Sequence, residues 1–257
     1  MIEFFSFKIF FLVFAAFLAG LIDSMVGGGG LIQVPALFSA FPNVLPATLF
    51  GTNKLSSIGG SLTATFRYLK EVKLPFKPML MASICALLGS LAGAYTLTKI
   101  PPTYVRLLLP LVLFVLLLFT IAKKDMGLQH APRLNSRSGR FFLTFGIGLI
   151  GFYDGFFGPG TGSFFMFLFA HYLGFDFLHS AAATKVVNSV TNFAALVLFI
   201  PTGHINWTIG LLMLAFNIIG GRLGSGLAVK NGSQLVRKVF IAVVLTLIIK
   251  TAIDAYL

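Results

Sequence analysis

Long apolar runs alternate with short polar breaks along the whole chain. Read as helices, the runs predict five membrane segments in the first half, at residues 4–22, 30–41, 45–69, 78–98 and 104–122. They predict five more in the second half, at residues 141–156, 161–173, 180–200, 207–229 and 239–256. Runs of about 20 apolar residues match a bilayer core of about 30 Å. We therefore expect an all-α, polytopic membrane protein with one membrane domain over residues 1–257.

The second segment of each half is too short to cross a bilayer unaided, since twelve helical residues span about 18 Å. Glycine-rich breaks precede both segments, and their members are Gly27, Gly28, Gly29 and Gly30 in the first half and Gly158, Gly160 and Thr161 in the second. Unwound backbone at membrane depth is tolerated only where it is buried in protein or lines a cavity. Two breaks in corresponding positions predict half helices at a transport site. The alternative is that the glycines only let helices pack closely.

The two halves repeat each other with a constant offset of 131 residues, which carries Gly20 to Gly151. Further identities in this register are Lys54 with Lys185, Ala64 with Ala195, Gly89 with Gly220, Gly93 with Gly224, Lys99 with Lys230 and Arg106 with Arg237. A repeat of this length is not a solenoid unit, whose period is about 20–50 residues. We expect a first repeat at 4–122, a basic cytoplasmic linker at 123–140 and a second repeat at 141–257. The paired glycines at 89, 93, 220 and 224 predict close helix packing.

Composition supports a membrane domain, with 57% hydrophobic and 10% charged residues and a mean hydropathy of +0.95. Basic residues outnumber acidic ones 19 to 7. They concentrate in predicted loops that the positive-inside rule makes cytoplasmic: Arg67, Lys70, Lys73 and Lys77; Lys123, Lys124, Arg133, Arg137 and Arg140; and Lys230, Arg237 and Lys238. Five segments per half invert the second half and put these loops on one face, with both termini outside, although Lys99 and Arg106 then lie on the opposite side. Four segments per half would make the halves parallel.

The helix after each break carries a polar stripe. Its members are Asn53, Ser57, Gly60, Ser61 and Ala64 in the first half, and Thr184, Asn188, Thr191, Asn192 and Ala195 in the second. Small and hydroxyl side chains at these intervals place one face against a neighbouring helix or against water. A packing role and a place in a polar cavity both remain open, but the carboxamides would need hydrogen-bond partners in lipid.

Ionisable residues stand at the same depth. Lys54 and Lys185 either attract an anion, pair with Asp23 and Asp154, or snorkel to the interface. The two aspartates end the first helix of each half, where each caps the half helix, carries a coupling proton or pairs with a lysine. Arg222 has no basic equivalent in the first half. It either offers a planar fork to an oxyanion or reaches the cytoplasmic interface.

These motifs resemble the sulfite exporter TauE/SafE family, also called the toluene sulfonate uptake permease family. The resemblance rests on Gly-x-x-Asp-Ser-x-x-Gly-Gly-Gly-Gly at 20–30, Pro35, the run at 47–55 and Gly-Phe-Tyr-Asp-Gly-Phe-Phe-Gly-Pro at 151–159. It covers nearly the whole chain and is nearest to a bacterial inner-membrane subgroup of mostly unassigned substrate. It implies a carrier of sulfite, sulfonates or other small organic anions, often moving outward. It also implies that Gly27–Gly30, Asn53, Lys54, Gly158–Gly160 and Lys185 lie on the translocation pathway.

The amides at the start of each half helix carry the positive end of its dipole, so they suit an anion. We therefore expect a secondary transporter of small anions that works by alternating access and is an exporter, with an anion channel as the alternative. A membrane enzyme is less favoured because the histidines are scattered and no ligand spacing occurs. The expected partners are a small anionic substrate and the lipid bilayer, and a homo-oligomer is left open. We expect no nucleic acid, cofactor or metal.

Overall fold

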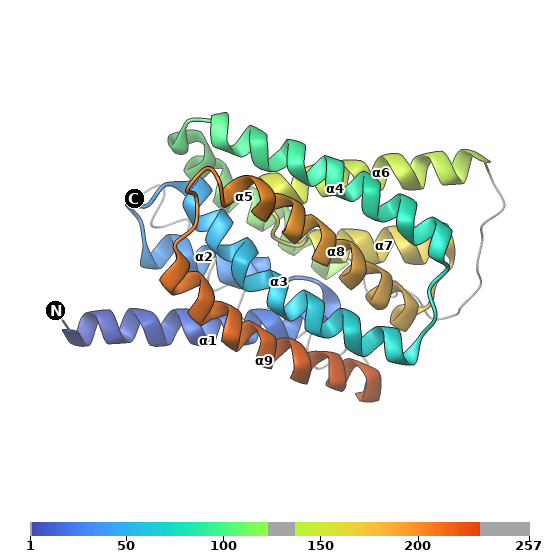
Figure 1. Ribbon diagram of the computed structural model, residues 1–257, viewed down its shortest axis with the longest axis horizontal. Coiled ribbons are helices and arrows are strands. Elements are labelled where there is room, and N and C mark those ends of the chain that lie inside the picture. The colour runs from blue at the N-terminus through green and yellow to red at the C-terminus, as the bar shows by residue number, and fades with distance from the viewer. Residues whose placement is uncertain (1, 123–136, 232–257) are drawn as a thin grey trace.

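The computed structural model describes residues 2–122 and 137–231. In chain order the helices there are α1 (Ile2–Val26), α2 (Gly30–Ala40), α3 (Pro46–Glu71), α4 (Phe76–Lys99), α5 (Pro102–Ala122), α6 (Arg137–Phe156), α7 (Thr161–Leu173), α8 (Phe177–Phe199) and α9 (Trp207–Asn231) (Figure 1). Within these ranges all regular secondary structure is helical, which confirms the predicted fold class. The predicted segment at 239–256 lies outside the described residues.

The helices extend further into the basic segments than the apolar pattern predicts. Basic residues that were expected in loops but lie within helices are Arg67, Lys70, Lys77, Arg137, Arg140 and Lys230. In particular, α6 begins at Arg137, inside the range 123–140 predicted as a linker. Lysine and arginine are good helix formers. A helix therefore continues past the residue at which its apolar run ends.

Pairs of helices from opposite halves pack closely along two edges of the molecule: α1 lies along α9, and α6 lies along α4 (Figure 1). A Cβ added to Gly220 of α9 would lie 2.1 Å from the Phe17 carbonyl oxygen of α1. A Cβ added to Gly89 of α4 would lie 2.2 Å from the Gly148 carbonyl oxygen of α6. These close approaches confirm the packing role predicted for the repeated glycines.

The two contacts are equivalent in the repeat, because the offset of 131 carries Gly89 to Gly220 and Phe17 to Gly148. The first helix of each half thus packs against the fourth helix of the other half. Such reciprocity is the pattern of an isologous, two-fold interface. The inversion of the halves relative to a bilayer stays a prediction.

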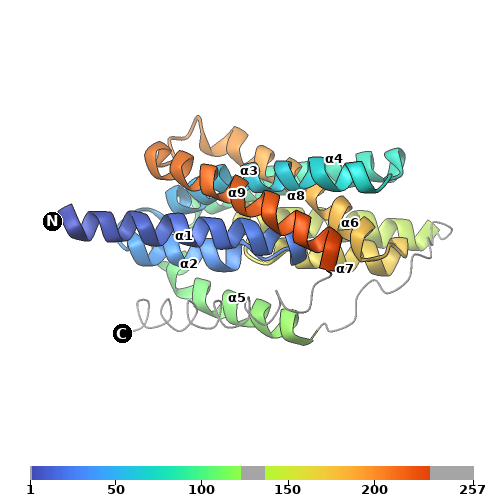
Figure 2. The same cartoon turned by 90° about the horizontal axis from the view of Figure 1, so that it is seen from below.

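Four helices are long and apolar enough to cross a membrane, judged over the described ranges: Phe7–Met25 within α1, Phe76–Lys99, Phe177–Phe199 and Trp207–Lys230. The outer face of α4 exposes Leu80, Ile84 and Leu88, as expected of a lipid-facing surface. In α8, by contrast, 72% of the residues in its 18-residue apolar stretch are buried, whereas the share in α4 is 33%. The helix α8 therefore lies at the centre of the bundle, and Figure 2 shows α5 lying to one side of it.

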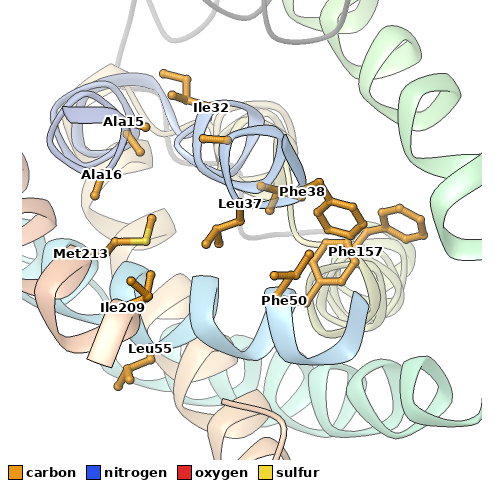
Figure 3. Packing of buried hydrophobic residues seen from close by; sticks show 14 of the residues in the cluster. Ala15, Ala16, Ile32, Leu37, Phe38, Phe50, Leu55, Phe157, Ile209 and Met213 are labelled. Atoms are coloured by element: carbon orange, nitrogen blue, oxygen red, sulfur yellow. The ribbon is translucent and has the colours of Figure 1, made fainter. Parts of the chain in front are cut away.

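The main hydrophobic cluster joins the two halves (Figure 3). Phe50 of α3 packs edge-on against Phe38 of α2 and Phe157, which follows α6, with ring centroids 5.4 and 5.5 Å apart. Met213 of α9 lies in the same cluster with Ala16 of α1. In a soluble protein, burying such an aromatic side chain would stabilise the fold by about 1.5–3 kcal/mol. In a bilayer, where the surroundings are also apolar, these side chains stabilise the fold through close packing. The cluster therefore fixes α2 against the end of α6.

The breaks before α2 and α7 meet inside the molecule. Gly27 and Gly158 have φ angles of +74° and +87°, in the left-handed region that glycine adopts without strain. A Cβ added to Gly27 would lie 2.5 Å from the Gly162 carbonyl carbon, and one added to Gly30 would lie 2.9 Å from Pro159 Cα. The short helices, of 11 and 13 residues, therefore begin at the same place, which is the centre of the candidate site.

Candidate functional site

Two ion pairs connect the halves, and the lysine of each is buried. Lys54 Nζ lies 2.7 Å from Asp154 Oδ2, and the side chains are 2% and 7% exposed. Lys185 Nζ lies 2.6 Å from Asp23 Oδ2, with side chains 0% and 22% exposed. Each lysine therefore pairs with the aspartate of the other half. The burial of both ammonium groups is inconsistent with snorkelling, and both lysines form an ion pair. Attraction of an anion stays a prediction.

The lysines reach this depth because both helices begin at a fixed point. Pro46 opens α3 at a position where a missing N–H costs nothing. At the start of α8, Asp176 accepts a hydrogen bond from His179 N at 2.8 Å, an ordinary N-cap. Lys54 and Lys185 follow eight residues after these starts, about 12 Å along each helix. That distance brings them level with the breaks.

The two carboxylates differ in their other contacts. Asp23 Oδ1 accepts a hydrogen bond from Gly29 N at 3.2 Å, so this residue also caps the first break. Asp154 Oδ2 is buried, and apart from the ion pair with Lys54 it accepts no hydrogen bond from the described part of the chain. The Asp154 carboxylate therefore depends on Lys54 more than Asp23 depends on Lys185.

A small cavity of about 30 Å³ lies between the breaks and the polar stripes. It has room for about two waters, since one needs about 10–15 Å³. The predicted site residues that line it are Asp23, Gly30, Asn53, Lys54, Ser57, Asp154, Gly158, Gly160, Thr161, Asn188 and Asn192. The predicted residues that do not line it are Gly27, Gly28, Gly29, Thr184, Lys185 and Arg222. Arg222 is exposed on α9, so the structure does not bring it to the site.

The starts of the short helices supply hydrogen-bond donors to this cavity. Within the described residues, the amides of Gly30 and Gly162 donate no hydrogen bond, and both residues are cavity-lining. Thr161 N donates to the Gly158 carbonyl oxygen at 3.2 Å. Asn188 Nδ2 lies beside Gly162: a Cβ added to Gly162 would be 3.2 Å from this nitrogen. Two helix N-termini with free amides thus face one polar space.

The polar stripes of α3 and α8 pack against each other and also line the cavity. Asn192 Nδ2 donates to Ser61 Oγ at 3.5 Å, and these two residues are equivalents in the repeat. The carboxamide oxygens of Asn53 and Asn188 are buried and accept no hydrogen bond in the described ranges. Because a buried polar atom without a partner is costly, packing between α3 and α8 does not by itself satisfy these carboxamides.

A comparison with known proteins fits this architecture. The family model described as "Sulfite exporter TauE/SafE" matches residues 12–251. The chain belongs to the sulfite exporter TauE/SafE family. It is 37% identical over 247 residues to the probable membrane transporter protein ORF9 of Sinorhizobium sp, covering 95% of this chain and 92% of that protein. It is 33% identical over 245 residues to the probable membrane transporter protein YfcA of Escherichia coli K12, covering 95% and 90%. No solved structure matches it significantly.

As a member of the TauE/SafE family, the chain is a multi-pass membrane transporter of the bacterial inner membrane. The family and relatives' names indicate a transporter rather than an enzyme. In the described ranges, no three His, Cys, Asp or Glu residues gather as metal ligands would.

Neither Gln33, which contacts a residue of this TauE/SafE site, nor Gly162, which lines it, was singled out from the sequence. Gln33 of α2 is fully buried; its Nε2 donates to Ser56 Oγ, and its Oε1 accepts from Ser57 Oγ at 3.2 Å. Its equivalent in the second half is Phe164, so this contact belongs to one half only. Gly162 lines the cavity as well. Two sequence signals could have identified them. Gln33 is a lone glutamine in a short apolar segment, and Gly162 is the last residue of the Gly-Pro-Gly-Thr-Gly run.

Proposed function

We propose that the protein is a secondary transporter that binds a small oxyanion, such as sulfite or a sulfonate, in the cavity at the meeting point of α2 and α7. The observation that carries the proposal is that two free helix N-terminal amides, at Gly30 and Gly162, share a buried space with the Lys54 ammonium. Helix N-termini bind anions because their unpaired N–H groups and dipoles present positive charge. In a space of low dielectric this attraction is stronger than in water.

Alternating access follows from the way in which the halves meet. The cavity is bounded by residues of both halves, and Ser61 and Asn192, which contact each other, are equivalents in the repeat. A relative rotation of the halves would therefore open the cavity toward one side at a time. The description of the family as a sulfite exporter supports a sulfur oxyanion as the substrate.

The test is counterflow in proteoliposomes that hold the purified protein. Vesicles preloaded with unlabelled sulfite or methanesulfonate should transiently accumulate the labelled anion above its external concentration, with saturation, and empty vesicles should only equilibrate it. When valinomycin and equal potassium concentrations clamp the membrane potential at zero, counterflow separates a carrier from a channel, because a channel then lets the label only equilibrate. Absence of saturable counterflow with both anions, in vesicles shown to be tight, would refute the proposal.

A matched pair of substitutions tests the location. Asn188→Asp adds a negative charge beside Gly162 with almost no change of shape, and should reduce counterflow at least about tenfold through charge repulsion at low dielectric. Asn206→Asp is the control, because Asn206 Oδ1 accepts from Ile209 N at 3.2 Å and an aspartate serves equally well at such a cap. Equal activity of the two variants would place the anion elsewhere.

A further inference from the structure

We infer that the two ion pairs, although equivalent in the repeat, have different tasks, and that Lys54–Asp154 is the pair that couples transport to protons. In this inference the anion displaces Asp154 from Lys54, and the released carboxylate takes up one proton. Lys185–Asp23 remains closed and holds the halves together. The inference rests on the proposed function, since it concerns the same cavity.

The position of the lysines distinguishes the pairs. Lys54 lines the cavity, whereas Lys185 does not. Lys54 Nζ also lies 3.1 Å from where a Cβ of Gly158 would be, beside the second break. An anion held by the amides of the short helices would therefore meet Lys54 first. Lys185 is fully buried and reaches Asp23 alone among the acidic residues in the described ranges.

The carboxylates differ in the same direction. If Lys185 left Asp23, the hydrogen bond from Gly29 N would still stabilise that carboxylate. If Lys54 left Asp154, the buried Oδ2 would have no remaining partner among the described residues. An unpaired buried charge is strongly unfavourable, and such a group becomes neutral instead. Asp154 is therefore the carboxylate that gains a proton when an anion occupies Lys54.

Other charged and titratable groups near the two aspartates do not replace this arrangement. Tyr68 and Arg67 of α3 are close enough to interact electrostatically with one another, and Tyr68 also with Asp23. Tyr153 interacts in the same way with Asp154. The hydroxyl groups of both tyrosines already donate, Tyr68 to the Ser24 carbonyl oxygen at 2.5 Å and Tyr153 to the Pro159 carbonyl oxygen at 2.8 Å. Lys54 is therefore the cation whose removal changes the charge state of Asp154.

Charge balance sets the stoichiometry. With both ion pairs closed, the two lysines and two aspartates sum to zero. A monovalent anion at Lys54 leaves one excess negative charge, and one proton on the Asp154 carboxylate cancels it. After the halves move, the anion and the proton leave on the other side, and the Lys54–Asp154 pair forms again. Each cycle moves one anion with one proton and no net charge.

The first test uses the unmodified protein in proteoliposomes at mildly acidic pH, where sulfite and methanesulfonate are monovalent, with whichever gives the larger counterflow as the probe. A pH difference of one unit should drive accumulation up to about tenfold toward the alkaline side, since a tenfold proton ratio is transferred to the anion. A membrane potential imposed at equal pH should change accumulation less than about twofold. Accumulation that follows the potential and ignores pH would overturn the inference.

The second test compares Asp154→Asn with its repeat equivalent Asp23→Asn, with the amount of folded protein checked by size exclusion. Asp154→Asn should retain counterflow at a reduced rate but lose accumulation driven by pH. Asp23→Asn should lower both activities in proportion, so the ratio of accumulation to counterflow stays that of the unmodified protein. Coupling that persists in Asp154→Asn, or is lost in Asp23→Asn instead, would overturn the assignment. Absence of counterflow in the unmodified protein refutes the proposed function and this inference with it.

Discussion

The close approach of α4 to α6 makes a sharp prediction for Gly89→Ala. The added methyl would lie 2.2 Å from the Gly148 carbonyl oxygen and 2.8 Å from Phe152 N, where ordinary contacts begin near 3.4 Å. The two helices must therefore separate by about 1 Å, and contacts along the interface weaken together. Overpacking of this kind costs about 1–3 kcal/mol. Because the clash is with backbone atoms, we expect the upper end of this range. Alanine's helix propensity returns up to about 1 kcal/mol, which leaves a net loss of about 2 kcal/mol.

The matched control is Gly148→Ala, on the facing helix of the same interface. The nearest atom to its added methyl is the Cys85 carbonyl oxygen at 4.0 Å, so this variant should be unchanged or slightly more stable. The assay is the fraction of monodisperse protein that survives heating in detergent. For a chain of this size, about 2 kcal/mol corresponds to a midpoint lower by about 4–8 °C. Equal midpoints for the two variants would show that the helices do not meet as described.

Three further outcomes are expected. Lys185→Met should lower the free energy of unfolding by about 3–5 kcal/mol because it leaves Asp23 without its cation, and adding Asp23→Asn should restore much of that loss. A double-mutant cycle from thermal midpoints measures the coupling energy between the two residues. A coupling energy near zero would contradict the ion pair. Gly27→Ala should abolish the folded peak on size exclusion, because the added methyl would lie 2.5 Å from Gly162 at a φ of +74°. The control Gly203→Ala has a φ of +72° but nothing within 4 Å, so it should cost only about 1–2 kcal/mol of left-handed strain. Similar yields of the two variants would contradict the packing of the breaks. Arg222→Gln should leave counterflow unchanged because the side chain is exposed on α9, and a loss of anion affinity would return this residue to the site.

Local pattern predicted the helices well because each apolar run is its own signal. The range 161–173 predicted for the second short helix is that of α7, and the break before it is marked by glycines that no regular helix requires. The helix ends were less accurate where basic residues extend a helix, as at Arg137. There the apolar run stops at the edge of the expected hydrocarbon, but the backbone hydrogen bonds continue.

The partners in the site could not be predicted in the same way. A repeat places Lys54 and Lys185, and Asp23 and Asp154, in equivalent positions, but pairing within each half and pairing across the halves satisfy the same offset. Only the three-dimensional exchange of helices between the halves selects the second arrangement. The prediction that Arg222 contacts the anion is not supported for a related reason. Whether this side chain is exposed depends on how α9 is rotated about its own axis. Sequence spacing gives the relative angles of side chains on a helix, not the direction of the neighbouring helix.

The composition of α3 has a consequence for biosynthesis. This helix has 26 residues, yet its polar stripe keeps it out of the set that could cross a membrane on composition alone. The insertion machinery selects segments by their hydrophobicity, so α3 leaves the ribosome as a poor candidate for release into lipid. Its polar face packs against α8 and α9, which begin at Phe177 and Trp207 and are synthesised much later. Stable integration of α3 must therefore wait until most of the second half has been translated.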